Sequence, residues 1–237
     1  MSDTPPRSPQ ASDFKIATVQ AVIFTDATNF SVVRVLQHFH PSVASIFNVE
    51  PVVLPSGGLP PEIPRVLLAS EGGQWQAQVG PLRCDLIWRS PDTQNSAQIA
   101  AVLSQAAGWL FKYLEMTGST AGRAAVVLTR FVECKLPGLM LAHHFCQERW
   151  YEQPLNRPQS FELHAHKSYQ LGQTEVNSWF RAKSGEFETV EQKAPIVLAE
   201  QDLNTLPRDG ELPHHEAATF FVACPEELDH ILSLYFP

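Results

Sequence analysis

The chain has 237 residues, of which 44% are hydrophobic, and its formal net charge is −8 at neutral pH. An apolar fraction of this size can fill a substantial core, which excludes disorder for most of the chain. No apolar run approaches the ~20 residues that a membrane-spanning helix needs. The polar, proline-rich first residues lack the apolar stretch of a secretory signal. These features predict a cytoplasmic protein with no membrane partner.

The acidic balance argues against nucleic acid as a partner, because a negatively charged chain repels phosphate backbones. The cysteines lie far apart and form no CxxC pair, whereas zinc sites usually need closely spaced ligands. We therefore expect free thiols, no metal and no cofactor. The cysteines are Cys84, Cys134, Cys146 and Cys224.

The first predicted elements are a tail, a strand and a helix. Residues 1–13 are polar and rich in proline, which predicts a disordered tail. The stretch from Phe14 to Phe24 is apolar on both of its alternating faces, as is typical of a central strand. Asp26 can then cap a helix, and Pro41 should end or interrupt it.

A loop, two strands, a long helix and a further strand follow. Residues 51–64 contain PSGGLPPEIP and predict an irregular surface connection. The runs 65–70 and 75–88 predict strands joined by a turn, although Gly80-Pro81 could divide the second run in two. Apolar residues at helical spacing predict a helix that Ser90-Pro91-Asp92 begins and Gly118 closes. Residues 124–132, rich in valine, predict another strand.

The second half of the chain has a different order of elements. A short helix is expected over 136–149, followed by strands near 160–171, 176–183 and 196–200. A terminal helix with an apolar stripe is expected to begin at Cys224.

This order of elements predicts an α+β fold with a mostly antiparallel sheet and helices packed on it. The first half reads as a ferredoxin-like βαββαβ unit, and the second half adds α-β-β-β-α. Residues 14–237 are expected to form a single domain. The segment 153–159, QPLNRPQ, is the best candidate for a joint within it.

His164 and His166 are the most suggestive residues for chemistry, and they stand in the run FELHAHKSYQL. In a strand, residues i and i+2 share a face, so both imidazoles could reach one substrate or one ion. The same alternation also suits an ordinary solvated sheet face that includes Glu162 and Ser168. The sequence leaves both interpretations open.

His143 and Arg181 complete the candidate catalytic set. His143 and His144 lie ~100° apart on a helix, so only one of them can point toward the His164 strand. No HExxH, GxSxG, GxGxxG or GxxxxGK motif occurs, so no catalytic, metal or nucleotide motif is complete. The acidic cluster Glu200-Gln201-Asp202 could bind a cation or cap the turn after its strand.

Three apolar segments carry a resemblance to a known family: VQAVIF in the opening strand, GRAAVVLTRFVE after the long helix, and IVLAEQDLNTL in the last strand. With these segments, the layout over most of residues 14–237 resembles an uncharacterised, sporadically distributed family of bacterial proteins. The resemblance implies a bacterial origin and an α+β fold. It brings no catalytic residues with it.

The first functional hypothesis is a non-enzymatic binding or scaffold protein that acts through a protein–protein interface. It would bind a protein partner or itself, as a homodimer or as a subunit of a bacterial complex. Exposed aromatic side chains are favoured at interfaces, because they bury a large area at a small entropic cost. The aromatic residues expected to be partly exposed are Trp150, Tyr151, Tyr169, Trp179 and Phe187.

The alternative hypothesis is a small-molecule hydrolase or a metal-dependent enzyme that uses the strand pair His164 and His166. In that case His143 and Arg181 would lie nearby, and the histidines would act as acid, base or metal ligands. The two hypotheses differ in whether the imidazoles converge on a sheltered cleft or lie on an open surface.

Overall fold

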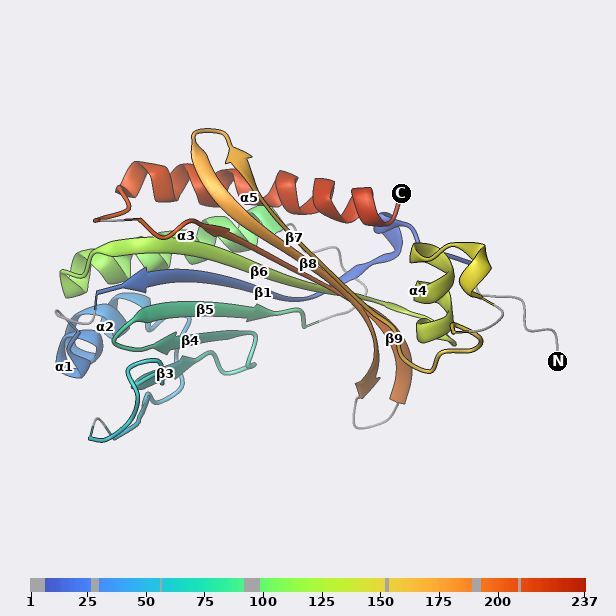
Figure 1. Ribbon diagram of the computed structural model, residues 1–237. Helices are drawn as coiled ribbons and strands as arrows, with labels where there is room; N and C mark the ends of the chain where they lie inside the picture. The colour runs from blue at the N-terminus through green and yellow to red at the C-terminus, as the bar shows by residue number, and fades with distance from the viewer. Residues whose placement is uncertain are drawn as a thin grey trace.

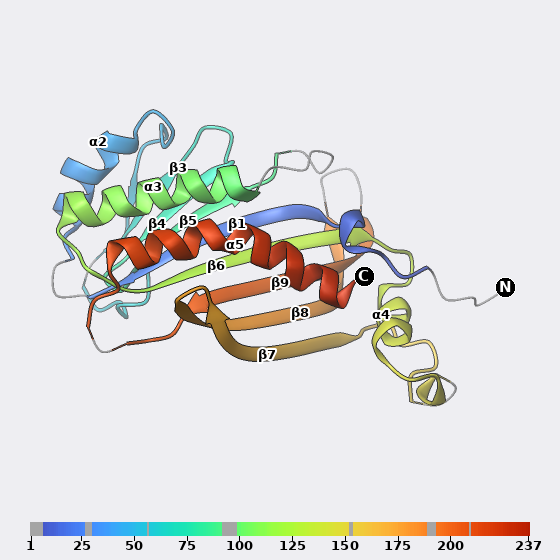
Figure 2. The same ribbon diagram turned by 90° about the horizontal axis from the view of Figure 1, so that it is seen from above.

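The chain folds around one antiparallel sheet with helices packed against one of its faces (Figures 1 and 2). The computed structural model describes residues 7–26, 30–55, 57–91, 99–151, 154–188, 193–208 and 210–237. Within these residues nine strands form the sheet, and the fold is α+β as predicted. No helix in this part of the chain is both long enough and apolar enough to cross a membrane.

The first strand of the chain lies in the middle of the sheet. The order of neighbouring strands is β2-β3-β4-β5-β1-β6-β9-β8-β7, and each pair runs antiparallel. Strand β1 therefore pairs with β5 on one side and β6 on the other. The strands are β1 (Lys15–Thr25), β2 (Val52–Val53), β3 (Val66–Ala69), β4 (Trp75–Val79), β5 (Arg83–Arg89), β6 (Ala121–Glu133), β7 (Glu162–Leu171), β8 (Thr174–Glu188) and β9 (Lys193–Thr205).

The sheet is larger than the sequence predicts. Part of the expected irregular connection 51–64 forms the short strand β2, which pairs with β3. The run 75–88 is two strands, because the chain turns at Gly80 and Pro81. Strand β9 continues to Thr205, so Glu200-Gln201-Asp202 lies within the strand and does not cap a turn at its end. The ladder to β8 and β6 on either side extends the strand beyond the length that its apolar run indicates.

Two long helices lie side by side over the sheet (Figure 2). Helix α3 (Ile99–Thr117) ends before Gly118, whose φ of +67° suits a residue without a side chain. Of its predicted start, Ser90-Pro91-Asp92, the last residue lies outside the described residues. The remaining helices are α1 (Val32–Arg34), the π-helical segment η3 (Val35–Phe39), α2 (His40–Val43), α4 (Pro137–Phe145), α5 (His214–Tyr235) and the 3-10 helices η1 (Ala11–Asp13) and η4 (Glu148–Trp150).

Proline has different effects in two of the helices. Pro41 interrupts the first helix as predicted: it lacks an amide hydrogen for the turn before it, and a π-helical segment precedes it. The expected start of the last helix at Cys224 is wrong. Helix α5 begins at His214 and passes through Pro225, because its buried face is continuous across the proline from Phe220 to Leu228.

The helices cover two apolar clusters on the same face of the sheet. The larger cluster lies under α3 and the first half of α5. The smaller joins α4, β8, β9 and the end of α5 around Phe236. Within the predicted tail, Ala11–Asp13 form a 3-10 helix, and the Ala11 amide donates to the carbonyl of Phe236 at 2.8 Å. Residues 1–6 of that tail lie outside the described part.

The strands on both sides of the predicted joint belong to one sheet. Strand β6 precedes residues 153–159 and strand β7 follows them, and both strands belong to the same sheet. Residues 152 and 153 are outside the described residues. From 154 onward the segment leads from the 3-10 helix η4 (Glu148–Trp150), which follows α4, to β7.

Asp85 is a buried carboxylate on β5. Its side chain is 2% exposed, it lies 2.9 Å from Arg83 Nε, and it accepts a hydrogen bond of 2.8 Å from Gln20 Nε2. Burial raises the pKa of the Asp85 carboxyl, while Arg83 and Gln20 act in the opposite direction. The native protein therefore holds this proton more tightly than the unfolded chain does.

This raised pKa predicts a pH dependence of stability. As pH rises from the unfolded pKa through the native pKa of Asp85, the stabilisation that its protonated form provides is lost. We expect wild type to lose stability relative to Asp85→Asn over this range, since asparagine does not ionise. Urea unfolding of both proteins between about pH 3 and pH 6 would measure the difference. A difference that stays constant, or that changes in favour of wild type, would contradict the assignment.

Candidate functional site

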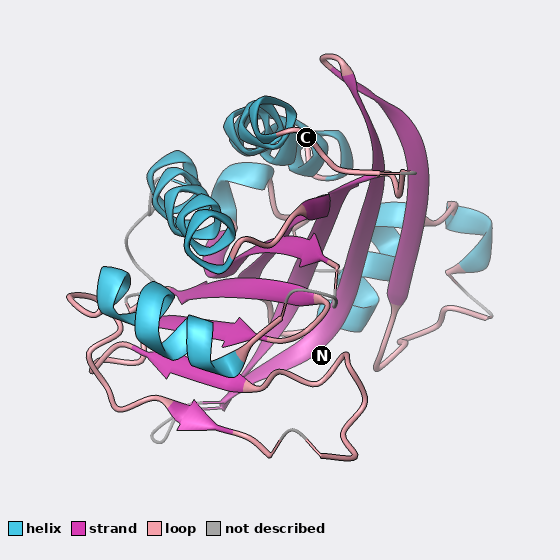
Figure 3. Cartoon of the chain, turned by 90° about the vertical axis from the view of Figure 1, so that its left-hand side faces the viewer, coloured by secondary structure: helices cyan, strands magenta, loops and turns pink. Residues whose placement is uncertain are grey.

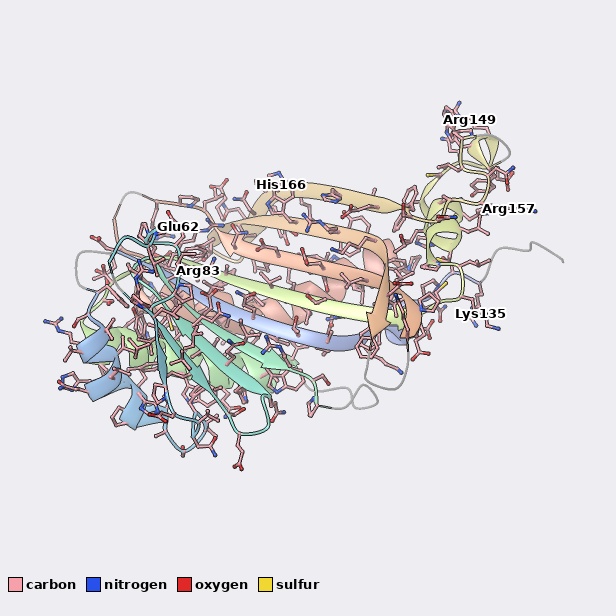
Figure 4. All side chains as sticks on the ribbon, turned by 90° about the horizontal axis from the view of Figure 1, so that it is seen from below. Glu62, Arg83, Lys135, Arg149, Arg157 and His166 are labelled. Atoms are coloured by element: carbon pink, nitrogen blue, oxygen red, sulfur yellow. The ribbon has the colours of Figure 1, made fainter. Side chains whose placement is uncertain are left out.

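On the second face of the sheet, none of the helices that the structure describes lies over the central strands (Figures 3 and 4). The side chains on this face are buried where β1 and β5 meet, since Val22 is 3% exposed and Asp85 is 1% exposed. The face is open over β7, β8 and β9, where His164, His166 and Trp179 are all exposed. The polar side chains that the sequence singles out on β7 therefore lie on an open surface.

Strand pairing aligns side chains from three strands into rows on this surface. His166 pairs with Trp179, and Trp179 pairs with Asp202. In the next row, His164 pairs with Arg181, and Arg181 with Glu200. Because directly opposite residues in antiparallel strands share a face, each row brings three side chains together. Two of the predicted site residues, His164 and Arg181, are thus neighbours in space.

Trp179 is the large exposed aromatic residue of this face, with 45% of its surface accessible. The His166 ring stacks on it with centroids 4.0 Å apart and an interplanar angle of 15°. His166 Nε2 also lies 3.3 Å from Asn177 Oδ1, which accepts a hydrogen bond of 2.7 Å from Ser168. His166 is therefore positioned against the indole and not toward His164.

His164 belongs to a separate network of ion pairs. His164 Nε2 lies 2.7 Å from Glu162 Oε1, and this hydrogen bond lowers the pKa of the Glu162 carboxyl. Arg181 Nη1 lies 2.9 Å from Glu200 Oε1, and Arg181 Nε lies 3.6 Å from the same Glu162 oxygen. Arg181 is thus shared between two carboxylates, one on each neighbouring strand.

A groove of about 280 Å³ lies over β8 and β9 beside Trp179. Trp179 lines the groove, whereas His166, which stacks on Trp179, does not. Two carboxylates, one arginine, one histidine and Trp179 line it, together with Phe180, whose ring stacks on Tyr235 in the cluster around Phe236. The lining residues are His164, Trp179, Phe180, Arg181, Glu200 and Asp202.

Asp202 differs from the other carboxylates of this surface in its partners. Its Oδ1 accepts a hydrogen bond of 2.9 Å from Asn204 Nδ2, and the Asn204 oxygen accepts one of 2.5 Å from Arg123. Within the described chain no cationic side chain forms an ion pair with Asp202. It is therefore a partly buried carboxylate next to an exposed indole, held in place by an amide.

His143 lies apart from this surface. It is on α4, where its ring stacks on Tyr151 with centroids 3.8 Å apart. Helix α4 packs on the opposite face of the sheet, in the apolar cluster around Phe236. The neighbouring His144 is held there too, with its Nε2 2.6 Å from the Tyr235 carbonyl. The candidate set of His164, His166, His143 and Arg181 therefore does not converge on one point.

Within the described residues, no group of three or more His, Cys, Asp or Glu side chains is placed to hold a metal ion. The His164–Glu162 pair is the closest contact between an imidazole and a carboxylate on this surface. Both side chains are about half exposed, at 46% and 47%, so the pair lies in open solvent. The arrangement is better suited to binding than to chemistry that needs exclusion of water.

A larger cavity of about 620 Å³ lies on the helical side, between the end of α3 and the start of α5. Its wall includes Lys112, Glu115 and His214, and the His214 ring lies 4.0 Å from that of Phe111. Its polar lining residues are Lys112, Glu115, Ser119, Glu211 and His214. The groove on the open sheet face has the denser set of aligned charged side chains.

No protein-family model matches this chain, and no curated protein matches its sequence.

Proposed function

We propose that this protein binds a protein partner through the open surface of β7, β8 and β9. The proposal rests on one observation: Trp179 is 45% exposed and is held by a stacked His166 at the centre of rows of polar side chains. An exposed, rigidly held tryptophan is the kind of residue that contributes most to binding energy at interfaces. The groove beside it is a concave surface that can accommodate a side chain of the partner.

Preorganisation of this surface supports the same proposal. Strand β7 is tied to the helical layer, because the Tyr169 hydroxyl donates a hydrogen bond of 2.5 Å to Glu227 on α5. On the open side, Ser168 and His166 both contact Asn177. A surface whose side chains are already ordered loses less conformational entropy when a partner binds.

We infer further that the frame of this surface is an enlarged ferredoxin-like unit. The neighbour order β4-β5-β1-β6 supports this inference, because it sets the first strand between a hairpin and the strand that follows α3, as expected for a split βαβ unit. In such folds the helices lie on one face of the sheet. This arrangement would explain why the opposite face is left for binding.

Site-specific photo-crosslinking tests the proposed interface. A benzophenone amino acid at Ser168, on the open face, should form a discrete crosslinked product in cells that express the protein naturally. Trp179→Ala should reduce the yield of this product at least about tenfold, as expected for an interface hot spot. Trp150→Ala is the matched control, because Trp150 is 44% exposed and lies on a remote 3-10 helix.

The result depends on the contrast between the two tryptophans. A product whose yield responds to Trp179 but not to Trp150 supports the interface, whether the captured protein is a second copy or another chain. The absence of any crosslinked product, or equal effects of the two substitutions on its yield, would contradict the proposal. Circular dichroism of both variants checks that they remain folded.

A further inference from the structure

The groove beside Trp179 has an unbalanced charge. Three carboxylates lie in or next to it, on Glu162, Glu200 and Asp202. Arg181 contacts the first two, and Lys183 faces Glu162 across the strands. These pairings account for Glu162 and Glu200, and in the described part of the chain no cationic side chain forms an ion pair with Asp202.

The unmatched carboxylate lies in the same row as the exposed indole. Asp202 on β9 pairs directly with Trp179 on β8, so the two side chains are neighbours on one face. His166 occupies the indole on the β7 side. The groove, which His164, Arg181 and Glu200 also line, therefore combines the Trp179 indole with a carboxylate that forms no ion pair within the described residues.

We propose that this groove binds the guanidinium group of an arginine side chain from the partner protein. A guanidinium is planar, so it can stack on the indole while its N–H groups donate to the Asp202 carboxylate. It is also more weakly hydrated than an ammonium group, which makes it easier to bury in a half-open groove. The net charge of −8 favours a basic partner at longer range.

The inference rests on the proposed function, since it names the group that the open surface recognises. Asn204 is part of the recognition, because its amide fixes Asp202 Oδ1 and leaves the second carboxylate oxygen for the ligand. Arg181 does not compete with the ligand for Asp202, since its Nη1 is paired with Glu200 Oε1 at 2.9 Å. An arginine inserted here would complete the charge pairing of the three-strand surface.

Titration of the whole chain with N-acetyl-arginine amide tests the proposal. The five tryptophan indole N–H signals can be followed by NMR, and Trp179→Phe assigns the signal of Trp179. This signal should shift in a saturable way. The matched neutral compound, N-acetyl-glutamine amide, should leave it in place. Trp150, whose ring already faces Arg149 at 4.9 Å, is the internal control and should not respond.

Asp202→Asn is the deciding variant, because asparagine keeps the acceptor for Asn204 but removes the charge. It should weaken the arginine compound at least about fivefold, the scale of a charge-assisted contact at a half-exposed site. Equal shifts with the two compounds, or an unchanged affinity in Asp202→Asn, would overturn the proposal. If crosslinking from Ser168 still depends on Trp179 in that case, the interface stands and only the arginine assignment fails.

Discussion

Replacing Asp229 by alanine is expected to destabilise the fold by about 3 kcal/mol, although Asp229 lies on the surface. Its side chain is 64% exposed, whereas that of its partner Arg130 is 7% exposed. Arg130 extends from β6 under α5, and its Nη2 donates to Asp229 Oδ1. Its Nε is buried and has no hydrogen-bond partner. Loss of the carboxylate therefore leaves a buried positive charge with little compensation.

The opposite substitution should be much milder. Arg130→Met removes the buried charge together with its need for a partner, and we expect it to change stability by no more than about 1 kcal/mol. Glu226→Ala, at another exposed acid of α5, should stay within about 0.5 kcal/mol. Urea unfolding of the three variants measures the order. If Asp229→Ala costs no more than Glu226→Ala, then the buried arginine does not depend on this partner.

Gly138→Ala is expected to cost about 2 kcal/mol, even though alanine favours helices. Gly138 lies in the first turn of α4 and is buried. A methyl group there would lie 2.6 Å from the Pro158 carbonyl oxygen and 2.7 Å from the carbonyl carbon and oxygen of Gln159. All these atoms belong to the backbone, so the helix or the segment before β7 must move.

Gly108→Ala provides the matched control in α3. A methyl group at this exposed position meets no atom within 4 Å, so alanine should stabilise the helix by up to about 1 kcal/mol. The two glycine substitutions should therefore have opposite signs in an unfolding titration. A neutral or stabilising Gly138→Ala would show that α4 does not pack closely on residues 158–159.

The sequence predicts the α3 helix and the strand class of most segments, because these depend on local periodicity and on local stop signals such as Gly118. It fails where tertiary packing outweighs a local signal. Pro225 indicates a helix start, but the buried face from Phe220 to Leu228 continues the helix through it. Strand β2 has only two residues, and its pairing with β3 is not visible in a local pattern.

The candidate site shows the same division between local and long-range information. The spacing of His164 and His166 places both on one face of a strand, and the structure agrees. Their neighbours Trp179 and Asp202 come from β8 and β9, whose register depends on hairpin geometry. The sequence predicts that Trp179 is partly exposed, but it does not predict that the His166 ring stacks on the indole.

His143 illustrates the converse error. Adjacent histidines on a helix suggest that one of them could meet the strand pair, but α4 packs on the far side of the sheet. The side of the sheet on which α4 packs follows from the apolar residues of the helix. Here these are Met140 and Leu141, which belong to the apolar cluster around Phe236. The apolar residues of α4 would have been a better guide than its histidines.

The strand order also has a consequence for synthesis on the ribosome. Strand β6 pairs with β9, not with β7, which follows it more closely along the chain. One edge of β6 therefore stays unpaired from the time Glu133 emerges until the chain beyond Lys193 is available. Long-range pairing of this kind slows folding, and an exposed strand edge can recruit other chains. The interval between these two residues is when a nascent chain would need a chaperone most.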